Sequence, residues 1–119
     1  MQGTRFTISY HTAGALAANH SFIFKLPFDA QLIGVSAAGS NANNGILDVG
    51  KTASLEAYVL NMDVGDSNVA AILDENTDFV GGEFPHIAAG TNIIATLDYD
   101  GASGTAVNDF TLVLIFSEG

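Results

Sequence analysis

The residues most suggestive of chemistry run from Gly45 to Thr52 and spell Gly-Ile-Leu-Asp-Val-Gly-Lys-Thr. This spacing matches the phosphate-binding loop of nucleotide-binding proteins, in which backbone amides, a lysine and a hydroxyl contact phosphate oxygens between a strand and a helix. Here, however, Asp48 would repel a phosphate. The interior also holds three bulky residues typical of a strand: Ile46, Leu47 and Val49. We therefore interpret the segment as a strand that ends in a Gly-Lys turn, with Lys51 either in solvent or paired with a nearby acid.

Histidines and acidic loops are the next candidates for chemistry. His11, His20 and His86 are not spaced as metal ligands on one element, so we expect structural roles for them. Two groups of acidic residues stand out: Asp63, Asp66, Asp74, Glu75 and Asp78 cluster in the sequence, and Asp98, Asp100 and Asp109 flank the last turn. Residues 63–68 have oxygen ligands but lack the full spacing and the terminal glutamate of an EF-hand loop. Calcium binding there stays open, and the alternative is that these side chains bond nearby backbone groups in turns.

The remaining residues suggest no catalytic constellation. The chain has no cysteine, which removes disulfides, thiolate metal sites and a thiol nucleophile. It has neither a G-x-S-x-G turn nor a recognisable triad. Paired carboxylates could serve a glycosidase. The chain, however, has few aromatic side chains on which a sugar ring could stack, since it contains no tryptophan and three tyrosines. We expect no catalytic, cofactor-binding or metal-binding residues, and therefore a protein that is not an enzyme.

Composition indicates one acidic globular domain over residues 1–119. Of these residues 48% are hydrophobic, enough for a single core. The net charge is -10, and the basic residues are Arg5, Lys25 and Lys51. Phosphates of nucleic acid and anionic membrane surfaces would repel such a chain, so we expect neither as a partner. No apolar run reaches the roughly 18 residues of a membrane helix, and residues 1–5 show no secretory pattern.

Short segments of alternating polarity recur, and these elements must position any site. The last one, residues 109–117, alternates almost perfectly between two faces. One face is wholly apolar and consists of Phe110, Leu112, Leu114 and Phe116. The other consists of Thr111, Val113, Ile115 and Ser117, which is apolar at its centre. Both faces therefore need cover, from a second sheet or from another subunit.

Seven further segments complete the expected strands: residues 5–11, 21–26, 31–37, 46–49, 54–60, 69–73 and 92–99. Residues 54–60 also fit a helical face, and residues 69–73 also fit one helical turn. Residues 13–19 fit a loop or a weak helical turn, and residues 79–85 an irregular segment. About eight short strands at near-regular spacing predict an all-β protein, which is either another antiparallel β-sandwich or a jelly roll, and we favour the jelly roll. Strand count alone does not separate these two topologies.

Three stretches resemble the small jelly-roll decoration, or cement, proteins of tailed bacteriophage capsids: residues 24–37, 79–91 and 97–119. The resemblance implies a homotrimer on the local three-fold positions of an icosahedral shell. Such a trimer would bind the major capsid protein on the capsid exterior and resist the pressure of packaged DNA. Val113 and Ile115 would then pack between protomers.

The leading hypothesis is therefore a non-enzymatic virion structural protein. An alternative is a carbohydrate-binding or receptor-binding β-sandwich module of a virion or secreted protein, with Tyr58 or Tyr99 at the glycan. A third is a small nucleotide-binding enzyme that uses Lys51.

Overall fold

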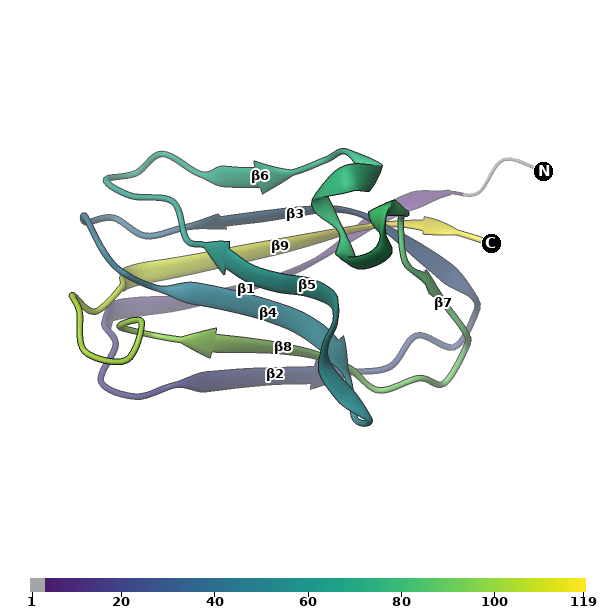
Figure 1. Ribbon diagram of the computed structural model, residues 1–119, viewed down its shortest axis with the longest axis horizontal. Coiled ribbons are helices and arrows are strands. Elements are labelled where there is room, and N and C mark those ends of the chain that lie inside the picture. Colours follow the sequence, from purple (N-terminus) through teal and green to yellow (C-terminus); the bar gives the residue numbers. More distant parts are fainter. Residues whose placement is uncertain (1–3) are drawn as a thin grey trace.

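The computed structural model describes residues 4–119, which form strands joined by loops and two short 3-10 helices (Figure 1). Residues 1–3 lie outside the described residues. They belong to the domain expected over residues 1–119 and to the N-terminal stretch, residues 1–5, in which no secretory pattern was found. The elements are β1 (Arg5–Ala15), β2 (His20–Phe24), β3 (Ala30–Ala38), β4 (Ile46–Lys51), β5 (Ser54–Asp63), β6 (Ala71–Leu73), η1 (Asn76–Asp78), η2 (Val80–Gly82), β7 (His86–Ile87), β8 (Ile93–Asp98) and β9 (Asn108–Glu118). No helix in the described part of the chain is long and apolar enough to cross a membrane.

The strands form two sheets that pack face to face. The first sheet has the order β1-β9-β3-β6, with β7 also paired to β3, and the second has the order β2-β8-β4-β5. Four antiparallel pairs nest around the β4–β5 turn: β4 with β5, β3 with β6, β2 with β8, and β1 with β9. Alternate pairs fall in opposite sheets, as when one long hairpin is rolled up. This strand order is that of a jelly roll, so the predicted sandwich is confirmed.

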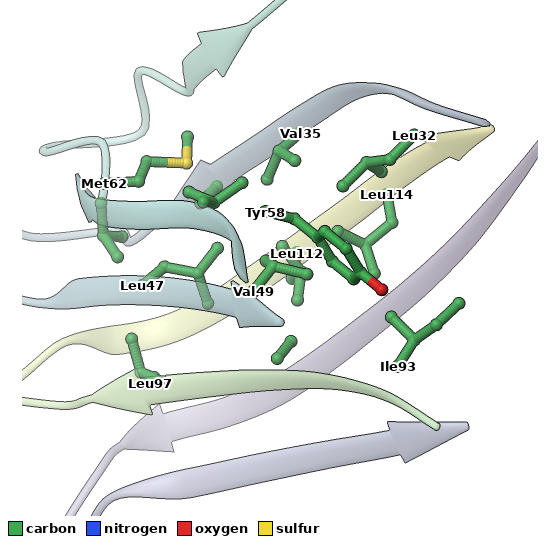
Figure 2. Packing of buried hydrophobic residues seen from close by; sticks show 14 of the residues in the cluster. Leu32, Val35, Leu47, Val49, Tyr58, Met62, Ile93, Leu97, Leu112 and Leu114 are labelled. Carbon is green, nitrogen blue, oxygen red and sulfur yellow. The ribbon is translucent and has the colours of Figure 1, made fainter. Parts of the chain in front are cut away.

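The core lies between the sheets and follows the alternation of the strands. On β9 the four residues Phe110, Leu112, Leu114 and Phe116 are fully buried. Figure 2 shows Leu112 and Leu114 facing side chains of the second sheet, among them Leu47, Val49, Tyr58, Ile93 and Leu97. Each large apolar side chain buried in this way stabilises the fold by about 1.5–3 kcal/mol. The predicted inward face of the last strand is therefore confirmed.

The opposite face of β9 lies on the outside of the first sheet. Thr111, Val113, Ile115 and Ser117 are half-buried there. They point away from the second sheet, because successive side chains of a strand alternate between its faces. The second sheet therefore does not provide the cover that the sequence predicts for Val113 and Ile115.

Several local expectations are resolved by strand pairing. Residues 54–60 belong to a strand and not to a helix, because β5 pairs with β4. Residues 71–73 likewise form a strand against β3. The expected loop over residues 13–19 is partly wrong, because β1 continues through a register shift to Ala15, with Gly14 at φ 81°. An additional strand, β7, follows the irregular segment and pairs with Ala30 and Gln31.

Candidate interaction surfaces

The segment that matches a phosphate-binding loop is a strand. Ile46–Lys51 is β4, which pairs with β8 on one side and with β5 on the other. Lys51 is exposed at its end, and a tight turn rather than a helix follows. The chain doubles back so closely that a Cβ on Gly50 would lie 2.3 Å from the carbonyl oxygen of Ser54. The strand interpretation is confirmed, and the backbone amides of this segment are not gathered into a phosphate cradle.

The three histidines lie on different strands, β1, β2 and β7. His11 has a structural contact, since its Nδ1 lies 2.8 Å from the hydroxyl of Thr111 on the neighbouring strand. Within residues 4–119 no group of three or more His, Asp or Glu side chains could hold a metal ion.

Acidic side chains of the loops bond backbone N–H groups, as the turn interpretation predicts. Asp66 accepts from the N–H of Asn43 at 3.1 Å. Asp78 accepts from two successive N–H groups, of Asp74 and Glu75, at 3.1 Å each. The turn before β9 uses the same chemistry, because the carboxylates of Asp98 and Asp100 both accept from the N–H of Ala102. These contacts fix loop geometry at the ends of the sandwich.

Asp109 ties the two terminal strands to the loop after β3. Its carboxylate accepts from the N–H of Gly14 at 2.7 Å and from the hydroxyl of Ser40 at 2.8 Å. These two donors, together with His11, hold the pKa of Asp109 below its ordinary value, against a smaller opposing effect of desolvation. The arrangement is an anchor for the loop and has the features of structure rather than of catalysis.

An asparagine cluster at the same end of the sandwich is a feature that the sequence interpretation missed. Asn41 accepts from the N–H of Asn108 and donates to the carbonyl of Ala106, both at 2.9 Å. Asn43 donates to the carbonyl of Gly65 at 3.2 Å. The cluster borders a polar pocket of about 320 Å³ whose lining includes Asn43, Asn44, Asp63, Asp66 and Gly101. The density of asparagine in residues 41–44 was the available signal.

The two tyrosines considered for glycan contact differ in accessibility. Tyr58 is 8% exposed and its ring lies in the core (Figure 2). Burial raises its pKa, and its faces are not available for stacking on a sugar. Tyr99 is half-buried, and its pKa is raised first by the neighbouring charge of Asp100. Of the two rings, that of Tyr99 is therefore the one with accessible surface.

The outer face of the first sheet is a surface without carboxylates at its centre. Across the strands, Val113 lies between Ser9 and Ser36, and Ile115 lies between Thr7 and Gly34. Ser36 in turn pairs with Ile72, which is 55% exposed. We call this surface the outer patch and define it by Thr7, Ser9, Ser36, Ile72, Val113 and Ile115. Centres of protein interfaces are depleted of charge, and in a chain of net charge -10 this patch is suited to contact another protein.

The second sheet also presents apolar side chains to solvent. Ile23 pairs with Ile94 across β2 and β8, and Ile23 is 62% exposed. On β5, Leu55 and Leu60 are 47% and 54% exposed. Asp48 interrupts this face, so it is less uniform than the outer patch.

Comparisons with known proteins bear on the fold. No protein-family model and no curated protein matches this chain. Among solved structures, a chain of the structure titled "Cyanophage Pam1 capsid asymmetric unit" is similar, with a TM-score of 0.60 and 15% identity. The superposition covers 99% of this chain and 87% of that chain. At this identity the likeness establishes a shared fold over nearly the whole length of the sandwich.

Proposed function

We propose that this chain is a virion structural protein that decorates the exterior of a phage capsid, bound to the major capsid protein as a homotrimer and without catalytic activity. The observation that carries the proposal is the shared fold, over 99% of the chain, with a chain of a cyanophage capsid structure. The resemblance of residues 24–37, 79–91 and 97–119 to decoration proteins points to the same class.

The outer patch supports a role in protein contacts. It is a sheet face rich in Ser, Thr, Val and Ile, with Ile72 strongly exposed. A trimer needs a heterologous contact, in which one surface of a protomer meets a different surface of the next. We assign the outer patch to one side of that contact. Repetition over a shell would multiply a modest affinity through multivalency.

Acidity supports an exterior position. A net charge of -10 keeps decorated particles apart and disfavours contact with DNA or with anionic membranes. The proposed protein therefore binds other proteins, and contacts neither nucleic acid nor lipid.

Co-sedimentation with shells tests the proposal. The full chain is mixed either with shells assembled from the major capsid protein of the same phage genome or with unassembled capsid protein. We expect binding to shells alone, and three chains, or a multiple of three, by sedimentation equilibrium. Ile115→Glu places a charge in the outer patch and should weaken trimer formation. Val80→Glu is the matched control, because Val80 is 46% exposed and lies outside the patch. Absence of shell binding by the wild-type chain would refute the proposal.

A further inference from the structure

β1 has a free edge whose unpaired backbone groups can be assigned. In the described chain β1 is outermost in the first sheet and pairs with β9. The N–H of Glu118 donates to the carbonyl of Thr4 at 2.9 Å, and the N–H of Gly119 to the carbonyl of Asp29 at 2.8 Å. Hydrogen-bonded pairs alternate along an antiparallel ladder, so even-numbered residues of β1 bond β9. The odd-numbered residues turn both backbone groups to the open edge: Arg5, Thr7, Ser9 and His11.

This edge lacks the usual protection against pairing. The register with β9 is regular from Arg5 to Thr12, and the irregularity comes only after Thr12. Natural edge strands are normally short, bulged, or interrupted by proline or lysine. The other outer strands follow that rule: β2 and β6 have five and three residues, and β5 has two register shifts. Among the described strands, β1 alone is long, regular and open.

The inward side chains of β1 are incompletely covered. Phe6, Ile8 and Tyr10 pack against the core but stay half-buried. Phe6 stacks on Phe116 of the neighbouring strand β9 at 5.3 Å, and Tyr10 stacks on Phe22 of the second sheet at 4.4 Å. In the described chain β9 flanks these residues on one side and no strand flanks them on the other. An added strand would cover it.

The distribution of charge along the chain makes the open edge of β1 a favourable place for a second copy to bind. All thirteen carboxylates of the chain lie at or after Asp29. The residues before it contain Arg5 and Lys25 and no acid. Two chains of net charge -10 repel each other least where carboxylates are absent. β1 carries no carboxylate of its own, and the carboxylate of Asp109 on β9 bonds the N–H of Gly14, which lies beyond the edge residues Arg5 to His11.

We propose that β1 pairs with β1 of a second copy, antiparallel about a two-fold axis. One register uses all four free residues: Arg5 faces His11 of the second copy, and Thr7 faces Ser9 of the second copy. It forms about eight backbone hydrogen bonds. The same register places Phe6 beside Tyr10 of the second copy and Ile8 beside its own equivalent. The first sheets of two chains then become one continuous sheet.

A proline substitution tests the pairing. His11→Pro removes an N–H that faces the edge and spares the ladder with β9, whereas the matched control His11→Ala keeps that N–H. His11 is exposed and lies outside the outer patch that is assigned to the trimer. By sedimentation equilibrium, edge pairing alone gives assemblies of two wild-type chains, and edge pairing together with the proposed trimer gives assemblies of six or more. His11→Pro should reduce these assemblies to one chain and to three chains, and His11→Ala should change neither. A wild-type mass of three chains that His11→Pro leaves unchanged would overturn edge pairing and leave the trimer standing.

Cross-linking gives an independent readout, including the case in which His11→Pro does not fold. The chain has no cysteine, so there is no background reaction. In the proposed register, Thr7→Cys of one copy and Ser9→Cys of another lie about 5.5 Å apart between Cα atoms, within reach of a disulfide. A mixture of the two variants should form disulfide dimers about tenfold faster than either variant alone, because pairing raises the effective thiol concentration. Equal rates would exclude this register.

Discussion

The side chain of Ile115 lies across Gly34 on the outer face of the first sheet, where a Cβ on Gly34 would be 3.0 Å from Ile115 Cδ1. The register shift of β3 between Leu32 and Gly34 brings these two residues opposite each other. Part of the cover that Ile115 needs therefore comes from the backbone of its own sheet. The rest of the side chain stays on the outer patch.

We expect Gly34→Ala to destabilise the protein by about 1 kcal/mol, because the added methyl group overpacks the site against Ile115. Combining it with Ile115→Val, which removes Cδ1, should recover part of the loss. Urea unfolding of the single and double variants measures this coupling. Strict additivity of the two substitutions would show that the residues do not interact.

Substitutions at Gly50 and Lys51 should distinguish the strand interpretation of this segment from a phosphate-binding loop. Gly50→Ala should cost about 2 kcal/mol or more, because the new Cβ meets backbone atoms of Ser54 and Leu55 that belong to the adjacent strand. Lys51→Ala, at an exposed position, should change stability by less than about 0.5 kcal/mol. Thermal unfolding with and without ATP and magnesium completes the test. A nucleotide-dependent rise in Tm that Lys51→Ala abolishes would contradict the strand interpretation.

Asp109 should make stability depend on acidity. The N–H of Gly14 and the hydroxyl of Ser40 hold its pKa below the ordinary value of 3.8. A lowered pKa in the folded state contributes stability above the unfolded pKa, and this contribution is lost as the pH falls through the folded pKa. Asp109→Asn should therefore lower Tm near neutral pH, with the difference from wild type shrinking below about pH 4. The Tm of Ser40→Ala should lie between those of wild type and Asp109→Asn. A difference in Tm between wild type and Asp109→Asn that does not change with pH would refute this account.

Substitution of Asn43 should destabilise the protein more than substitution of its exposed neighbours. The side-chain NH2 group of Asn43 donates to the backbone carbonyls of Asn41 and Gly65, and its side-chain oxygen accepts from the N–H of Gly45 at 2.9 Å. Asn43→Ala leaves part-buried backbone groups unpaired and should cost about 1–3 kcal/mol. Ala42→Ser is the control, at an exposed position next to it. Denaturant titration measures both, and equal stabilities would show that solvent replaces the lost bonds.

The sequence predicted those features that depend on neighbours along the chain. The two-residue period of residues 109–117 identifies the buried face of β9, because side-chain direction in a strand is a local property. For the same reason the bulky interior of residues 46–49 was enough to favour a strand over a phosphate-binding loop. The turn role of Asp78 is equally local, since its partners lie three and four residues away.

Tertiary structure decided everything that depends on which strands meet. The sequence did not select the nested pairing of β1 with β9 around the β4–β5 turn, because those partners are about a hundred residues apart and many registers satisfy the same alternation. Three further features were open for the same reason: the contacts of Asn41 and Asn43 with residues 106–108 and with Gly65, the helical or strand state of residues 54–60, and the existence of β7. The free edge of β1 also became visible only once its single partner was known.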